Sequence, residues 1–236
     1  EGKLAAREAK MVMFCSPHNP CGRAWTEEEL AGVVNLCYKY GVPLVCDEIH
    51  ADFVYVPNAH HSILNLPHAD ELAVMLCAAS KTFNVAGLQQ ASLVCKNERM
   101  REAIAKESTA CGVKSGNVFA LAATRAAYTD CDAWLDGLKA YLVGNRDSVT
   151  AYAKAHFPKV IVTPLEATYL MWLDCRALGL EQEELMRRLL NAHVKVNDGL
   201  FFGEGGRGFI RLNIGCPTQR LEIALDRVYA QYRKRF

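Results

Sequence analysis

The sequence predicts an α/β protein in which a mostly parallel sheet with helices is followed by a small α+β domain. One observation is a strand, a helix and a second strand between Met11 and Cys46, the pattern of a parallel crossover unit. Another is the change after Pro158, where short strands and short helices alternate. We therefore expect one domain over residues 1–136 and a second over residues 137–236.

The first crossover unit has clear start and stop signals. Met11–Cys15 is an uninterrupted apolar run, which is typical of a buried parallel strand. Thr26, followed three residues later by Glu29, predicts a capping box at the start of a helix, and Gly41 ends that helix. Val42–Cys46 is then the next buried strand.

The remaining elements follow from apolar periodicity and from turn residues. In the first domain we expect strands over Leu72–Ala78 and Ala91–Cys95, and helices over 97–108, 116–128 and 132–156. In the second domain we expect strands over Val160–Thr163, Thr168–Asp174, Val194–Val196 and Phe209–Ile214, and helices over Glu181–His193 and Thr218–Tyr232. The domain boundary then falls within the longest helix.

Composition excludes several classes of function. Hydrophobic residues make up 51% and charged residues 22%, which is ordinary for a soluble globular protein. The net charge of +1 predicts no attraction to nucleic acid or to anionic lipid. No apolar run reaches the roughly 20 residues that span a bilayer. The ten cysteines include no C-x-x-C pair, and they predict a reduced, cytoplasmic protein rather than a disulfide framework.

Polar side chains follow the ends of three predicted strands: Asn19, Asp47 and the pair Ser80-Lys81. Ligands of open parallel sheets bind beyond the carboxyl ends of the strands, so these residues could converge. Pyridoxal 5'-phosphate (PLP) suits an amine, a carboxylate and an amide, because it carries an aldehyde, a ring nitrogen that must stay protonated and a phenolic oxygen. A closed cleft at the strand end would desolvate Lys81 and make it a nucleophile.

Each of these residues also has an ordinary structural interpretation. Asn19-Pro20 is a common turn, Asp47 can cap a helix and Lys81 can be a surface lysine. Two further groups of residues do not indicate a ligand site. The glycine-rich segment Gly203–Gly208 lacks a phosphate-binding lysine and precedes a strand, so it is expected to be a loop. The histidines at 50, 60 and 61 match no standard spacing, so we expect no metal site.

Three motifs resemble a known family. Ser16–Arg23 is similar to the N-P-x-G motif of class I and II aminotransferases, which are fold-type I PLP-dependent enzymes. Asp47-Glu48-Ile49-His50 followed by Asp52 resembles D-E-I-H-x-D, and Ser80–Leu88 resembles S-K-T-F-N-x-A-G-L. Together with Gly206–Pro217, these motifs are similar to those of the MalY/PatB group of cystathionine β-lyases. The resemblance implies that the N-terminal domain is the C-terminal part of a large PLP-binding domain.

The resemblance also implies a role for each matching residue. Lys81 would hold PLP as a Schiff base and would move the Cα proton of the substrate. Asp47 would pair with the ring nitrogen, and Asn19 would donate to the phenolic oxygen. His50 takes the place of a tyrosine that serves the same oxygen in many aminotransferases, and Ser80 would contact the phosphate.

Substrate binding is implied for one arginine. Arg211 lies in a strand with alternating polarity, where a solvent-facing charge is the ordinary interpretation. By resemblance it binds the α-carboxylate of an amino acid, and a guanidinium suits that group because it makes a two-point contact. Gln89 departs from the family, since many aminotransferases carry a phosphate-binding arginine there.

The resemblance favours a C–S lyase that converts sulfur amino acids to a thiol, pyruvate and ammonia by α,β-elimination. A class I/II aminotransferase is the alternative, because it shares all the named residues. A non-catalytic binding or regulatory protein on the same fold is a second alternative. Family members extend further at the N-terminus and form homodimers, so we expect an N-terminally truncated chain that alone binds PLP weakly or is inactive.

Overall fold

The computed structural model describes residues 1–113 and 116–233 of the chain. The chain divides into two compact units. The N-terminal unit comprises Glu1–His18 and Ala24–Asp136, and the C-terminal unit comprises Asn19–Arg23 and Gly137–Phe236. Among the described residues, no helix combines the length and apolar character that a membrane crossing requires.

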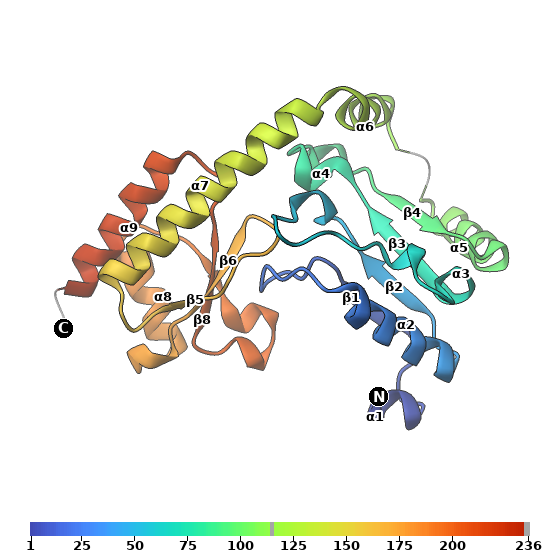
Figure 1. Ribbon diagram of the computed structural model, residues 1–236, viewed down its shortest axis with the longest axis horizontal. Coiled ribbons are helices and arrows are strands. Elements are labelled where there is room, and N and C mark those ends of the chain that lie inside the picture. The colour runs from blue at the N-terminus through green and yellow to red at the C-terminus, as the bar shows by residue number, and fades with distance from the viewer. Residues whose placement is uncertain (114–115, 234–236) are drawn as a thin grey trace. The chain divides into compact units, whose positions relative to one another are not determined.

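The N-terminal unit is built on a four-stranded sheet in the order β1-β2-β3-β4 (Figure 1). Its strands are β1 (Val12–Cys15), β2 (Leu44–Asp47), β3 (Ala73–Cys77) and β4 (Ser92–Cys95). β1, β2 and β3 run parallel, and β4 is antiparallel to β3. The register pairs Cys15 with Asp47 and Asp47 with Leu76, so three parallel strands end at one edge. The expected α/β class is confirmed.

The N-terminal unit also contains a set of helices around this sheet. They are α1 (Gly2–Ala5), α2 (Glu27–Tyr40), α3 (Ala69–Leu72), α4 (Ala79–Thr82), α5 (Glu98–Ala110), α6 (Val118–Asp130) and the first turn of α7 (Asp132–His156). The capping box of α2 is present, because Thr26 accepts from the Glu29 amide and Glu29 accepts from the Thr26 amide. Gly41 ends α2 with a φ of 63°.

The core of the N-terminal unit lies between α2, α3 and the strands. Leu30 and Val34 of α2 are fully buried together with Leu44, Ile63 and Ala73. Burial of an aliphatic side chain of this size contributes about 1.5–3 kcal/mol each. This packing holds β1, β2 and β3 in register and therefore sets where their polar ends lie.

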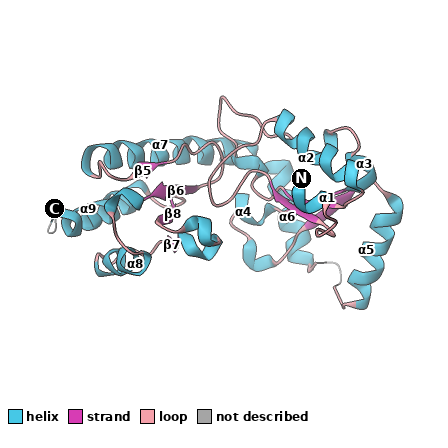
Figure 2. Cartoon of the chain, turned by 90° about the horizontal axis from the view of Figure 1, so that it is seen from below, coloured by secondary structure: helices cyan, strands magenta, loops and turns pink. Residues whose placement is uncertain are grey.

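The C-terminal unit contains an antiparallel sheet in the order β5-β6-β8-β7. Its elements are β5 (Ile161–Val162), β6 (Leu170–Asp174), β7 (Asn197–Asp198), β8 (Phe209–Asn213), α8 (Gln182–Asn191), α9 (Thr218–Arg233) and the rest of α7. Helices α7 and α9 run side by side (Figure 2), and the Tyr152 hydroxyl of α7 donates to Asp226 of α9. The small α+β architecture matches the prediction.

One predicted strand is wrong in position. We expected a strand over Val194–Val196, but pairing with β8 begins at Asn197. The reason is the end of α8, where the Val194 amide donates to the Leu189 carbonyl at 3.0 Å. Because this backbone group closes the helix, the chain becomes extended only after it.

Candidate functional site

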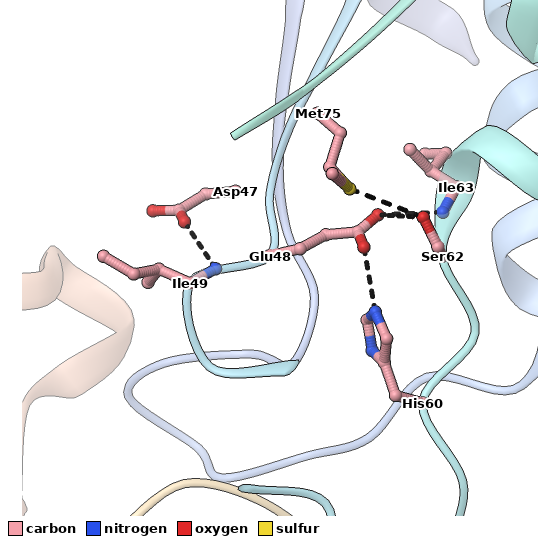
Figure 3. Close-up of polar contacts among 7 residues, drawn as sticks. All are labelled: Asp47, Glu48, Ile49, His60, Ser62, Ile63 and Met75. Carbon is pink, nitrogen blue, oxygen red and sulfur yellow. Dashed lines mark hydrogen bonds and ion pairs between the residues drawn. The ribbon is translucent and has the colours of Figure 1, made fainter. Parts of the chain in front are cut away.

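Asp47 is the last residue of β2 and lies at the edge where the parallel strands end. Its Oδ1 accepts a hydrogen bond from the Ile49 amide at 3.0 Å (Figure 3). The carboxylate is therefore oriented by a backbone amide in a short turn and not by a flexible side chain. One carboxylate oxygen is used in the turn, and the second can accept from a ligand.

Glu48 anchors the same turn from the inside, although the sequence suggested no role for it. The residue is 3% exposed, and its carboxylate accepts from the Ile63 amide at 2.8 Å and from the Ser62 hydroxyl at 3.3 Å. His60 Nε2 lies 2.8 Å from the second carboxylate oxygen. Figure 3 shows these groups converging on Glu48 from the segment 60–63, which leads into η2 (Ile63–Asn65). A buried carboxylate with three polar neighbours fixes the backbone beside Asp47.

Two of the sequence motifs meet directly in the N-terminal unit. His50 is 3% exposed and precedes the short helix η1 (Ala51–Phe53). From η1, Asp52 accepts a hydrogen bond of 2.6 Å from the hydroxyl of Thr82, which is itself buried. Thr82 ends α4, so the D-E-I-H-x-D motif holds the single turn that carries Ser80 and Lys81.

Lys81 is exposed, and this corrects the expectation of a buried amine. Ala79 and Thr82, three residues apart in α4, occupy the buried face of this turn. Lys81 lies between them in sequence and therefore projects from another side, while Ser80 is half-buried. The chain supplies the position of the amine but does not enclose it.

A cavity of about 310 Å³ adjoins this edge within the N-terminal unit. Glu48, Asp52, His60 and Tyr128 contribute polar groups to its wall. Burial raises the pKa of Tyr128 to about 12, with a smaller contribution from Asp52, so its phenol stays protonated as a donor. No group of three or more metal-ligating side chains occurs in the part of the chain that the structure describes.

Asn19 belongs to a short segment that packs into the C-terminal unit. The amides of Glu166 and Ala167 both donate to the Gly22 carbonyl at 2.9 Å. Gly22 has a φ of 68°, and a Cβ there would lie 2.4 Å from Leu165. The positive φ therefore favours glycine at this position of the N-P-x-G motif, and a larger residue would also displace the Leu165 side chain.

Asn19 and Arg211 are brought together by this packing. Arg211 of β8 donates from Nη1 to Asn19 Oδ1. Because the amide oxygen is taken, the Asn19 Nδ2 group can act as a donor toward a ligand. Burial lowers the pKa of Arg211, which nevertheless remains a cation at neutral pH.

The comparisons with known proteins define the class to which this chain belongs. The model of the family "Aminotransferase class I and II" matches residues 2–228, and the chain belongs to that family. The chain is 36% identical over 232 residues to cystathionine beta-lyase PatB of Bacillus subtilis, covering 98% of this chain and 60% of PatB. It is 37% identical over 224 residues to protein MalY of Escherichia coli, covering 94% and 57%.

A solved structure shows the same fold. Cystalysin from Treponema denticola, whose crystal structure contains pyridoxal 5'-phosphate, aligns with a TM-score of 0.95 and 29% identity. The alignment covers 99% of this chain and 61% of cystalysin. The chain thus spans about 60% of the length of the relatives it matches.

Proposed function

We propose that this chain provides cofactor and substrate residues of a PLP-dependent C–S lyase of the cystathionine β-lyase type. The reaction is α,β-elimination on a sulfur amino acid to a thiol, pyruvate and ammonia. The observation that carries the proposal is the shared strand edge of Asp47 and the α4 turn, which the Thr82–Asp52 hydrogen bond ties to the motif after β2. The identity to PatB supports it.

The residues present fit PLP by the chemistry of their polar groups. Asp47 keeps one carboxylate oxygen available for a protonated ring nitrogen, because the other accepts from Ile49. Asn19 keeps its Nδ2 donor available for a phenolic oxygen, because Arg211 occupies its amide oxygen. Lys81 offers an accessible amine to an aldehyde. An amine, a carboxylate and an amide donor are the three groups this cofactor needs.

Each side chain has a distinct proposed role. Bound PLP supplies an aldehyde for covalent attachment and a ring that accepts the electrons of the substrate Cα–H bond. Lys81 Nζ would hold the cofactor in the resting protein and, when free of it, would accept the proton from the substrate Cα. The Asp47 carboxylate keeps the ring nitrogen protonated, and His50 and Asn19 serve the phenolic oxygen. Ser80 donates to the phosphate.

Arg211 is proposed to bind the substrate α-carboxylate. A guanidinium makes two parallel hydrogen bonds to a carboxylate, and partial burial strengthens them because water screens the charges less. The substrate would therefore be an amino acid held at its α-carboxylate. The sulfur substituent on Cβ is the part that leaves as the thiol, while Cβ itself is retained in the pyruvate.

The wider assignments are also proposals. The N-terminal unit would be the C-terminal part of the large PLP-binding domain, and the C-terminal unit would be the small domain. The full-length protein would be a cytoplasmic homodimer. The cytoplasmic location is supported by ten free cysteines, several of them buried core residues.

An aminotransferase is the second candidate, because the same residues serve both reactions. The chain is also 28% identical over 229 residues to LL-diaminopimelate aminotransferase of Natranaerobius thermophilus. Identity is higher to PatB, which favours the lyase. An assay with a 2-oxo acid as amino acceptor separates the two, because only the transaminase converts it to an amino acid.

The test is the visible spectrum of the full-length protein loaded with PLP, before and after borohydride. We expect borohydride to fix the cofactor on the chain, and Lys81→Ala to abolish this fixation. Lys106→Ala, an exposed lysine of α5, is the matched control. Thiol release from cystathionine should fall about 10²–10⁴-fold in Lys81→Ala.

The length of the chain sets a second expectation. Because it spans about 60% of its relatives, we expect this chain alone to bind PLP weakly and to release little thiol. Borohydride fixation that persists in Lys81→Ala would rule out the proposed attachment site.

A further inference from the structure

Arg211 is surrounded by neutral hydrogen-bond acceptors. Asn197 of β7 stands directly opposite Arg211 in the antiparallel register. Its Oδ1 accepts from Arg211 Nη2 at 2.9 Å and from Nε at 3.3 Å. Asn19 Oδ1 accepts from Nη1. The Phe202 ring lies under the guanidinium, with its centroid 4.6 Å from Cζ.

These contacts leave a defined part of the guanidinium for a ligand. A guanidinium carries five N–H bonds, one on Nε and two on each Nη atom. Asn197 takes one from Nε and one from Nη2, and Asn19 takes one from Nη1. One N–H bond remains on each Nη atom, and both can donate to a carboxylate.

The backbone around Asn197 is fixed by a buried side chain. Gln182 is 5% exposed, and its Nε2 donates to Asp198 Oδ1 at 2.6 Å and to the Phe209 carbonyl at 3.1 Å. Its Oε1 accepts from the Gly208 amide at 2.7 Å. Gln182 therefore connects both ends of the loop between β7 and β8.

Close backbone packing tightens the same loop. A Cβ on Gly199 would lie 2.1 Å from the Gly206 carbonyl oxygen, and a Cβ on Gly206 would lie 2.0 Å from the Gly199 oxygen. No side chain fits at either position, so the loop closes on itself. This holds Asn197 and Phe202 in place against the guanidinium.

We propose that Asn197 is a positioning residue that orients Arg211 for the α-carboxylate of the substrate while leaving its positive charge unneutralised. The inference rests on the proposed function of Arg211. An aspartate at position 197 would also orient the guanidinium, but its charge would cancel the attraction for a carboxylate. An amide orients the cation and adds no competing charge.

The test compares two ligands that differ only in the carboxylate. Binding of L-alanine and of ethylamine to the PLP-loaded protein is measured by calorimetry, and the Arg211 Nε–H signal is followed by ¹⁵N NMR. In Asn197→Ala we expect an altered, rapidly exchanging Nε–H signal and L-alanine affinity about tenfold weaker, which corresponds to the loss of about one charge-assisted hydrogen bond. Ethylamine affinity stays unchanged, and Lys195→Ala, an exposed neighbour, changes nothing.

The aspartate variant separates orientation from charge. Asn197→Asp should keep the protected Nε–H signal and yet bind L-alanine at least about tenfold more weakly. Wild-type affinity for L-alanine in Asn197→Ala or Asn197→Asp would overturn the proposal. If the wild type binds neither ligand, the proposed function fails. The Nε–H signal then decides alone: its loss in Asn197→Ala supports positioning, and its persistence overturns it.

Discussion

In the C-terminal unit, β6 is buried along four of its five residues, whereas β4 of the N-terminal unit exposes three of its four. The candidate ligand groups differ in the same way. Arg211 is held by Asn19, Asn197 and Phe202, whereas Lys81 is exposed on a single helical turn. In the C-terminal unit, packing fixes the orientation of the candidate binding side chain itself. In the N-terminal unit, packing fixes only the backbone that carries the side chain.

The buried anchor of the N-terminal unit gives the largest expected effect on stability. Glu48→Ala leaves the Ile63 amide and the His60–Ser62 segment without their acceptor, so unfolding of this unit should become easier by about 2–4 kcal/mol. Urea titration with hydrogen–deuterium exchange measures it, because peptides from β2 and β6 report each unit separately. Glu48→Gln keeps an acceptor oxygen, so it should lower the free energy of unfolding by less. Equal protection of β2 in Glu48→Ala and wild type would contradict the anchor.

The corresponding anchor of the C-terminal unit is neutral. Asn145 of α7 is fully buried, donates to the carbonyls of Ile214 and Cys216, and accepts from Thr218. Asn145→Ala should destabilise β6 by about 2–3 kcal/mol and leave β2 unchanged. The same exchange experiment checks this, with Lys154→Ala on the exposed side of α7 as control. A loss of exchange protection in β2 as large as that in β6 would show that the units do not unfold independently.

An ion pair at the end of β6 should make the C-terminal unit pH-dependent. Hydrogen bonds from Arg176 lower the pKa of Asp174 below its usual value of 3.8, against a smaller opposite effect of burial. Folding therefore favours the ionised carboxylate. The stabilisation is complete well above pH 3.8 and is lost as pH falls through the lower folded-state pKa.

Because the Arg176 side chain is 65% exposed, solvent screens this pair and the effect should be only about 1 kcal/mol. Asp174→Asn should lose that amount at neutral pH and show a smaller deficit at acidic pH, as measured by urea unfolding at both pH values. An equal deficit at both pH values would assign the effect to packing instead.

An effect of similar size is expected in the N-terminal unit. Thr26→Ala removes the side chain that accepts from the Glu29 amide at 3.2 Å, which should cost about 1 kcal/mol. Exchange protection in the first turn of α2 is the measurement. Thr26→Ser retains the cap and should stay within about 0.5 kcal/mol of wild type. If both variants lose protection equally, the threonine methyl group and not the hydroxyl is responsible.

Local signals in the sequence predicted most elements because each depends on neighbouring residues. The capping box at Thr26 and the end of α2 at Gly41 were predicted to the residue. The strand expected over Val194–Val196 was misplaced, because the end of α8 used the same backbone. Apolar periodicity does not show which backbone amide will make the last hydrogen bond at the end of a helix.

The candidate site was predictable only in part. Motifs identified Asp47, Lys81 and Arg211 by number, and their roles remain predictions. Neither Glu48 nor Asn197 was assigned a role. The one signal for Glu48 was a second carboxylate at a strand end, and Asn197 had no signal apart from its place before a turn.

The sequence by itself determined the α/β class, the order of the elements and the motifs of the family, because each of these depends on residues that are close together in the chain. The tertiary structure alone decided that Asn19 and Arg211, 192 positions apart, share a hydrogen bond, and that Asp52 holds the turn of Lys81 through Thr82. It also decided that Lys81 is exposed. Strand register and packing between distant segments set these contacts, and neither is encoded in the residues next to them in the chain.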